Sequence, residues 1–344
     1  LVVFLSGTLF AALSDKSAVI YYGSEISYPM VGIHDYIIVK PENTNIYTHG
    51  FDVYKDKMYA SISIGEVNSK NDTIKENWIL AKNSSTNSDI VDVTNLEYQK
   101  FFIHEIIEPQ IKRGFNNFFL RNIDSYKLLK YTASQVKNYE EALIKLIYSF
   151  HMLHPKAKII IDGGVGILDR IYDGIEAVVL ESSSVDSDIK KIKSYNLEVI
   201  CTDYLDFEEM NKADKIVEHL KSKGAIPYVS PRGFTGYGRS SKNATKREIL
   251  VLITENEDDR IDISAHRHGG LVLEYLGYIE RLYNINKKKI PKLEDMTQYA
   301  GVIIWLPDYY QDAEQLITWV KKLDSKGIKV AFASNFGMTD TSLL

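Results

Sequence analysis

The stretch 117-NFFLRNIDSY-126 decides the expected fold, because it carries a buried strand directly into a polar cluster. Residues 117–120 are an apolar, aromatic run of the kind that forms a parallel strand covered on both faces. Residues 121–126 are too polar for an ordinary turn, and they begin with a charged side chain, Arg121. We therefore interpret the stretch as a strand whose carboxyl end reaches a candidate catalytic rim.

Seven further short runs of the same kind lie between residues 18 and 229, and amphipathic segments separate several of them. Eight strands, each leading to a helix or a long loop over roughly 210 residues, predict an α/β fold, a (β/α)8 TIM barrel, within residues 18–235. A doubly wound open sheet is the alternative. The expected strands are 18–22, 36–39, 58–64, 117–120, 158–161, 177–180, 199–202 and 226–229. The expected helices are 96–112, 133–153, 184–195 and 206–223, and residues 66–94 form a long insertion rich in Asn and Ser.

A second pattern begins after Pro231, where Gly233, Gly236 and Gly238 predict a flexible connection. Apolar runs at 249–253, 301–305 and 328–333 then alternate with expected helices at 269–283 and 312–323. This order predicts a second, flavodoxin-like parallel α/β domain over residues 248–344. We expect that domain to be truncated after its third strand.

The chain begins with 1-LVVFLSGTLFAAL-13, which resembles the apolar part of a secretory signal. The run is too short for a transmembrane helix. It predicts a partial signal peptide at residues 1–14 and a periplasmic or secreted location. The alternative is a first buried element of a cytosolic fold.

Charge and cysteine content exclude some classes of function. The 344 residues include 41 basic and 46 acidic side chains, a net charge of -5, which argues against a nucleic-acid partner. Cys201 is the only cysteine and lies in an apolar run, so we expect a packed core residue. A single cysteine provides neither a disulfide framework nor a Cys-based zinc site.

Acidic side chains follow five of the eight expected strands. In a TIM barrel the carboxyl ends of all the strands meet at one face, where the active site lies. Helix starts also favour Asp, so one such residue would mean little. Five carboxylates at one rim repel one another unless a ligand or a proton offsets their charge. The five are Glu66, Asp124, Asp162, Glu181 and Asp203.

Paired carboxylates without a nucleophilic cysteine suggest glycoside hydrolysis. One carboxylic acid protonates the leaving oxygen, and a second carboxylate stabilises or attacks the oxocarbenium-like centre. The segment His266–His268 lacks the spacing of a zinc motif, so we expect a surface or packing role and no metal. No cofactor is expected.

Five motifs stand at or near the ends of expected strands: 21-YYG-23, 59-YASISIGEV-67, 116-NNFFLRNIDSY-126, 179-VLESSS-184 and 202-TDYLD-206. Together they resemble the endo-α-1,4-polygalactosaminidase-like glycoside hydrolases. The resemblance covers residues 19–229 and continues into the second domain. It implies a TIM barrel acting on a partially de-N-acetylated galactosamine polymer in exopolysaccharide and biofilm biosynthesis. It also implies a polysaccharide substrate and exopolysaccharide export proteins as partners.

The resemblance also implies roles for individual residues. Glu181 matches a strand-end glutamate of the family and is expected to act as general acid/base. Glu66 is expected to bind substrate or to support the site. Asp203 and Tyr204 are expected to hold sugar hydroxyls or amines. Substrate contacts are also expected from two tyrosines at strand ends, Tyr22 and Tyr126.

Arg121 departs from the family pattern, which has an aspartate at this strand end. One interpretation is that hydrolysis is lost and the barrel only binds polymer. In a second, Asp124 or Asp162 has taken the role of the missing acid. In a third, Arg121 and Asp162 have exchanged charge between neighbouring strands and pair across the rim. Arg121 is also expected to be a substrate-binding residue.

Overall fold

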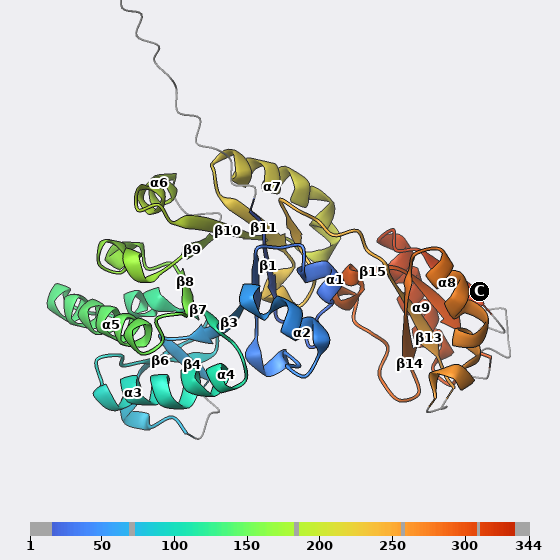
Figure 1. Cartoon of the computed structure of the whole chain (residues 1–344), viewed down its shortest axis with the longest axis horizontal. Helices are drawn as coiled ribbons and strands as arrows, with labels where there is room; N and C mark the ends of the chain where they lie inside the picture. The colour runs from blue at the N-terminus through green and yellow to red at the C-terminus, as the bar shows by residue number, and fades with distance from the viewer. Residues whose placement is uncertain (1–15, 69–72, 182–185, 256–258, 308–309, 334–344) are drawn as a thin grey trace, which may run out of the picture. The chain divides into compact units, whose positions relative to one another are not determined.

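The computed structural model describes residues 16–68, 73–181, 186–255, 259–307 and 310–333 (Figure 1). The expected signal peptide therefore lies outside the described residues. The chain divides into two compact units. The first comprises residues 1–234 and 238–243, and the second comprises residues 235–237 and 244–344.

Eight parallel strands form the ring of the first unit, which confirms the predicted TIM-like (β/α)8 fold (Figure 1). Each strand pairs with its neighbour in chain order, and all seven of these pairings are parallel. The strands consist largely of buried β-branched and aromatic residues, as expected where helices cover a parallel sheet. They are β1 (Ala18–Tyr21), β2 (Tyr36–Val39), β3 (Met58–Ser63), β7 (Asn117–Arg121), β8 (Lys158–Asp162), β9 (Ala177–Glu181), β10 (Glu198–Tyr204) and β11 (Ile226–Ser230).

Side chains hold the seam between the first and last strands of the ring. No β-ladder joins β1 to β11 among the described residues. Instead, the Tyr228 hydroxyl of β11 donates to the Ile20 carbonyl of β1 at 2.8 Å. A short ninth strand, β12 (Arg239–Ser240), runs antiparallel to β11, and the Ser240 hydroxyl accepts from the Ala18 amide at 3.4 Å. The ring is therefore nearly closed.

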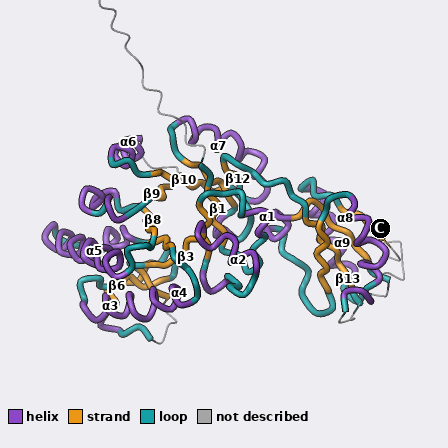
Figure 2. Tube along the Cα trace, viewed as in Figure 1, coloured by secondary structure: helices purple, strands orange, loops and turns teal. Residues whose placement is uncertain are grey.

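Helices surround this ring on its outer side (Figures 1 and 2). The longest, α5 (Ala133–Leu153), begins with a capping box between Thr132 and Gln135, which satisfies its first free amides. Its apolar face includes Phe150, whose ring meets Phe118 edge-on at 5.0 Å. The other helices of this unit are α1 (Tyr28–Val31), α2 (His49–Tyr54), α3 (Leu96–Phe101), α4 (Glu108–Lys112), α6 (Asp186–Ser194) and α7 (Ala213–Ser222).

Two expected helices are less regular than the sequence predicts. The segment 96–112 contains a π-helical stretch, Phe102–Ile107, between α3 and α4. The segment 206–223 begins as a 3₁₀ turn, Phe207–Lys212, and only then becomes α7. Apolar periodicity reports which face is buried, but it does not distinguish these tighter and wider turns.

The expected insertion at residues 66–94 folds into a small antiparallel sheet of its own. Its strands are β4 (Glu66–Asn68), β5 (Ile79–Asn83) and β6 (Ser88–Val91), in the order β4-β6-β5. Because β4 begins three residues after β3, this sheet is tied directly to the carboxyl end of a barrel strand.

The second unit contains a parallel sheet in the order β14-β13-β15-β16, the order in which flavodoxin-like sheets begin. The expected helix at 269–283 is wrong in its second half, because Gly277 ends the helix with a φ of 80° and a strand follows. The elements are β13 (Glu248–Ile253), α8 (Leu271–Tyr275), β14 (Ile279–Asn284), β15 (Tyr299–Trp305), α9 (Ala313–Ser325) and β16 (Val330–Ala333).

Candidate active site

Arg121 is placed in the mouth of the barrel by the register of β7 against its neighbours. Ser63 of β3 lies opposite Arg121, and Leu120 pairs with Ile161, so Asp162 follows at the same level on β8. The Arg121 guanidinium carbon lies 5.6 Å from the centre of the Tyr22 ring, a cation–π contact. Its Nε atom is buried and has no hydrogen-bond partner among the described residues.

Tyr22 follows β1 and is fixed by contacts with one other strand and two 3₁₀ turns. Its hydroxyl lies 2.8 Å from the Ser61 hydroxyl on β3. Its backbone amide donates to the Phe234 carbonyl at 2.7 Å, and the Asn43 side chain donates to its own carbonyl at 2.6 Å. Burial raises the pKa of Tyr22, while Arg121 and the Ser61 hydrogen bond oppose that rise. The phenol therefore stays neutral.

Asp162 is the carboxyl group that its surroundings perturb most clearly. Burial raises its pKa from 3.8 to about 6, although Arg121 and the Asn122 amide favour the charged form. Glu181 and Asp124 raise it further, as like charges do. No ion pair within 4 Å joins Asp162 to Arg121 in the described part of the chain, so the expected pair is an electrostatic neighbour and not a direct contact. Asp162 can therefore hold a proton under mildly acidic conditions.

Asp124 is occupied by the protein itself. One carboxylate oxygen accepts from the Gly164 amide at 2.9 Å, and the other lies 2.8 Å from the Lys127 ammonium. These two contacts join the 3₁₀ turn after β7 to the loop after β8. The structure thus gives Asp124 the geometry of a positioning residue, and the catalytic role expected of it stays a prediction.

Glu66 is buried and bound by four side-chain donors. Burial favours a higher pKa for this carboxyl group, but the hydrogen bonds outweigh burial and lower the pKa. With two donors at each oxygen, Glu66 anchors the inserted sheet to the rim and has little capacity left for a sugar. The donors are Asn83 at 3.0 Å, Ser125 at 2.5 Å, Thr86 at 3.1 Å and Ser88.

Glu181 and Tyr204 end neighbouring strands and face the same mouth. Glu181 is exposed at the end of β9, and it lies opposite Thr202 of β10 in the parallel ladder. Burial and the Glu181 carboxylate raise the pKa of Tyr204 to about 12, and Asp162 adds to the effect. Tyr204 therefore remains a hydrogen-bond donor at neutral pH. Asp203, the preceding residue, accepts from the Tyr204 amide at 2.7 Å.

Tyr126 is placed in the core and not in the open mouth. Only 2% of it is exposed, its hydroxyl donates to Glu140 at 2.6 Å, and its ring stacks on Tyr139 at 5.0 Å. These contacts fasten the turn after β7 to α5. The substrate contact expected of Tyr126 stays a prediction, and the structure gives it a packing role.

Phe234 is a residue of the mouth that the sequence reasoning missed. Its ring lies 5.3 Å from Tyr22, 5.4 Å from Tyr204 and 6.2 Å from Tyr228. Its φ of 56° is unusual for a residue with a bulky side chain. Arg232 stands beside it, 5.6 Å from the Tyr204 ring. The signal was the polar and aromatic segment that follows the eighth strand, 230-SPRGF-234.

A cavity of about 440 Å³ opens where the inserted sheet meets the rim, and we call it the rim pocket. Its size is typical of a small-molecule site. Most of its lining is polar, and Arg121 connects it to the mouth. The lining residues are Ser63, Glu66, Val67, Asn68, Thr86, Asn87, Ser88, Arg121 and Asn122.

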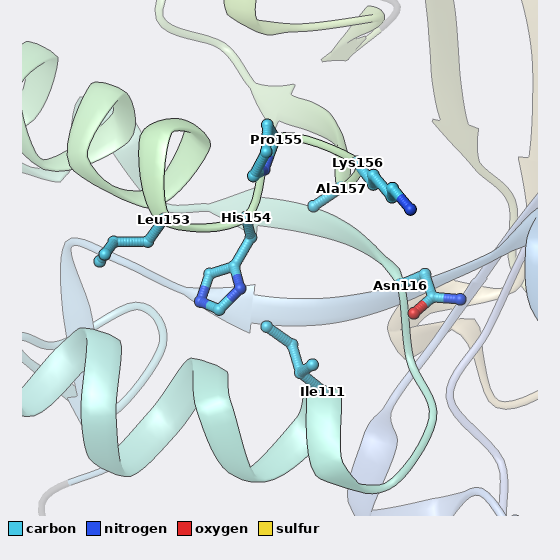
Figure 3. Close-up of a pocket in the computed structure, with 7 residues that line it drawn as sticks. All are labelled: Ile111, Asn116, Leu153, His154, Pro155, Lys156 and Ala157. Atoms are coloured by element: carbon cyan, nitrogen blue, oxygen red, sulfur yellow. The ribbon is translucent and has the colours of Figure 1, made fainter.

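A second cavity, of about 300 Å³, lies at the opposite end of the barrel (Figure 3). It is formed where α5 ends and where the chain enters β7 and β8, with His154 projecting toward Ile111 and Lys156 on the far side. TIM-barrel enzymes place their chemistry at the carboxyl ends of the strands. This second cavity therefore lies on the face associated with stability.

The described ranges contain neither a metal-binding cluster nor a membrane-spanning helix. No group of three or more His, Cys, Asp or Glu side chains there could hold a metal ion. The expected packing role of the His266–His268 segment fits its contacts, since His266 lies 2.7 Å from Glu280 and His268 stacks on Trp305. None of the helices that the structure describes has the length and apolar character needed to cross a membrane.

Comparisons with known proteins identify a matching family model and solved structures with a similar barrel. The model of glycoside-hydrolase family GH114 matches residues 55–246. No curated protein matches the sequence significantly. Among solved structures, the glycoside hydrolase domain of PelA from Pseudomonas aeruginosa is 18% identical with a TM-score of 0.58, covering 64% of this chain and 96% of that domain.

Two other solved structures have similar coverage. A variant of the same PelA domain is 18% identical with a TM-score of 0.56, over 64% of this chain and 96% of the other. Ega3 from Aspergillus fumigatus, solved in complex with galactosamine, is 11% identical with a TM-score of 0.49, over 63% of this chain and 91% of the other. At these identities the PelA likeness shows the barrel fold alone.

Proposed function

Since the chain belongs to glycoside-hydrolase family GH114, we propose that it hydrolyses a galactosamine-rich exopolysaccharide with Asp162 and Glu181 as its carboxyl pair. The observation that carries this proposal is the perturbed Asp162, whose pKa of about 6 suits a proton donor to a leaving oxygen. Glu181 is its electrostatic neighbour and is exposed to the mouth. It supplies the second carboxylate that a glycoside hydrolase needs.

A polymer with free amino groups suits an acidic mouth. Galactosamine units carry a positive charge at neutral pH, and Glu181, Asp162 and Asp203 stand at neighbouring strand ends. The sequence motifs that resemble polygalactosaminidases support the same substrate. The apolar run at residues 1–13 supports an exported protein that works in biofilm polysaccharide biosynthesis beside export proteins.

The experiment incubates the purified protein with a partially de-N-acetylated galactosamine polymer and measures reducing ends and oligosaccharide masses. Wild type should shorten the polymer, whereas Glu181→Gln and Asp162→Asn should each lower the rate at least a hundredfold. Glu105→Gln is the matched control, because Glu105 is an exposed carboxylate on the outer helical layer. Undiminished cleavage by either site variant would remove that residue from the mechanism.

A polysaccharide-binding barrel without hydrolysis is the second candidate function. The observation that favours it is Arg121, which stands in the mouth with a buried, unpartnered Nε in the described structure. This candidate predicts polymer affinity that Asp203→Ala weakens, together with no cleavage by wild type. Cleavage gained on Arg121→Asp would show that the arginine alone blocks hydrolysis.

A further inference from the structure

The rim pocket has a charged hydrogen-bond donor without a described partner, whereas its carboxylate acceptor is already occupied. Arg121 lines it, and its guanidinium makes no hydrogen bond to a described residue. The Glu66 oxygens, in contrast, each receive two donors from the inserted sheet and the turn after β7. The Nε atom of Arg121 is closed off from solvent, so a ligand would accept from the terminal nitrogens of the guanidinium, which have no described partner.

Two amide side chains extend the polar lining of the rim pocket. Asn122 accepts from the Ser63 hydroxyl at 3.0 Å through its oxygen, and its side-chain nitrogen makes no hydrogen bond to a described residue. The exposed Asn87 side chain has no partner within the described ranges. Neutral amides of this kind bind sugar hydroxyls without adding charge.

The charges at the rim pocket select against ionic ligands of either sign. A protonated amine would meet Arg121 and would find the Glu66 oxygens already occupied. A sugar carboxylate would meet the ionised Glu66 and the nearby acids Asp124 and Asp162. An uncharged group with a carbonyl oxygen escapes both repulsions and still satisfies Arg121.

We propose that the rim pocket is a sugar subsite for an N-acetylated hexosamine unit, whose acetamido oxygen accepts from a terminal guanidinium nitrogen of Arg121. This inference rests on the proposed function and narrows its substrate. The polymer then carries an acetylated unit at the rim pocket and a free amino unit against the acids of the mouth. Arg121 is then a specificity-determining residue, because it distinguishes an N-acetylated sugar from a free amino sugar at this subsite.

The test measures binding by isothermal titration with three probes: trisaccharides of N-acetylgalactosamine, of galactosamine and of galacturonic acid. Arg121→Met removes the donor and keeps the apolar stem. This variant should lower the affinity for the acetylated trisaccharide roughly tenfold or more, and it should leave the affinity for the galactosamine trisaccharide unchanged or higher. Lys145→Met, which removes an exposed charge on α5, is the control and should change neither.

A second variant guards against misfolding of the first. Asn87→Gly removes the amide and keeps the left-handed backbone, since the φ of Asn87 is 54°. It should weaken the acetylated trisaccharide roughly threefold, and the acetyl methyl signal should weaken in saturation-transfer NMR. Equal losses for the acetylated and galactosamine probes on Arg121→Met would overturn the inference, as would tightest binding of the galacturonate probe.

The two experiments test the proposed subsite and the proposed hydrolysis separately. Titration reports the rim pocket whether or not hydrolysis occurs, and polymer shortening reports the carboxyl pair. Cleavage of the polymer without an Arg121-dependent preference for the acetylated trisaccharide would support the proposed hydrolase activity and overturn the proposed subsite. Absence of both cleavage and binding would overturn the proposed function and the subsite together.

Discussion

Arg121 and Asp162 illustrate what single residues decide in the mouth of this barrel. Sequence reasoning placed them side by side at the ends of neighbouring strands, and the register places them there. It also offered a direct pair, whereas the structure shows an arginine that acts on Asp162 through its charge and keeps a buried Nε free of described partners. Proximity followed from the strand pattern, but contact depends on side-chain torsions that no pattern contains.

The raised pKa of Asp162 predicts a pH profile for cleavage. A general acid must be protonated, and Asp162 loses its proton above a pKa of about 6. The kcat/KM for the galactosamine polymer should therefore be highest on the acidic side of pH 6. It should fall about tenfold per unit above it. Rates measured from pH 4.5 to 8 check this, with Glu105→Gln as the control. A profile that stays flat above pH 6 would exclude Asp162 as the proton donor.

The same shift predicts that Asp162→Asn stabilises the protein at neutral pH. The pKa of Asp162 is about 6 in the folded protein, above its ordinary value of 3.8. The free energy of unfolding of the wild type therefore keeps the full contribution of the protonated Asp162 below pH 3.8, and it loses that contribution as the pH rises through 6. The loss is on the order of 2–3 kcal/mol, which the uncharged asparagine avoids. Urea unfolding at pH 7.5 should show a more stable variant and, at pH 4, a smaller difference. A variant that is less stable at pH 7.5 would contradict the burial of this charge.

Gly65 shows a steric requirement at the same rim. A Cβ atom built on Gly65 would lie 2.1 Å from the Asn122 carbonyl oxygen, a backbone atom that cannot move aside cheaply. We expect Gly65→Ala to lower the free energy of unfolding by more than about 2 kcal/mol. Gly166→Ala is the control, because its Cβ would meet only a side-chain oxygen at 3.9 Å. Equal stability of the two variants in thermal unfolding would refute the close approach.

At the scale of elements, the inserted sheet is a working part of the rim. Its strands β5 and β6 and the turn between them bring Asn83, Thr86 and Ser88 to the Glu66 carboxylate. The sequence shows a long Asn- and Ser-rich insertion, and it predicts neither a sheet nor this convergence. The reason is distance along the chain, since these donors lie 17 to 22 residues from Glu66.

Glu66→Gln should loosen the inserted sheet. The lowered pKa means that Glu66 adds stability above its ordinary value of 4.5 and loses that contribution as the pH falls through the folded value. The glutamine nitrogen would face hydrogen-bond donors, so we expect the free energy of unfolding to fall by about 2 kcal/mol at pH 7. The free energy of unfolding of the variant should also depend less on pH at acidic pH. Hydrogen exchange of residues 79–91 checks the location, because that segment should exchange faster. Unchanged protection there would show that the four donors contribute little.

The elements differ in how well the sequence predicts them. All eight barrel strands were located, because each is an apolar run bounded by polar segments. Strand β14 was missed, since Ile279–Asn284 lacks strict alternation of apolar and polar residues and was assigned to the helix before it. The π-helical stretch 102–107 was missed because apolar periodicity survives a single wider turn.

At the scale of the molecule, the two compact units predict independent folding of the first. All strands of the ring, the small sheet and β12 belong to residues before 244. A chain that ends at Asn243 should therefore unfold cooperatively and keep its polymer affinity. Calorimetry and the same titrations check this. A non-cooperative transition would show that the barrel needs the second unit to fold.

The fold of the whole chain was more predictable than its candidate site. Alternating strands and helices restrict the first unit to very few architectures, the count of eight strands favoured the barrel, and the motif resemblance supported it. The site depends on which polar groups satisfy one another. The pattern gave no sign that Glu66 and Asp124 are bound by the protein or that Tyr126 is buried against α5.

The seam between β1 and β11 gives the barrel a direction of mechanical weakness. Elsewhere in the ring every neighbouring pair of strands is joined by a continuous ladder, whereas the described seam is held by Tyr228, Ser240 and Phe234, whose carbonyl accepts from the Tyr22 amide. Force applied across the seam would load these few bonds, while force across any other pair would load a whole ladder at once. The barrel should thus open under tension at its seam, beside Tyr22 and the mouth.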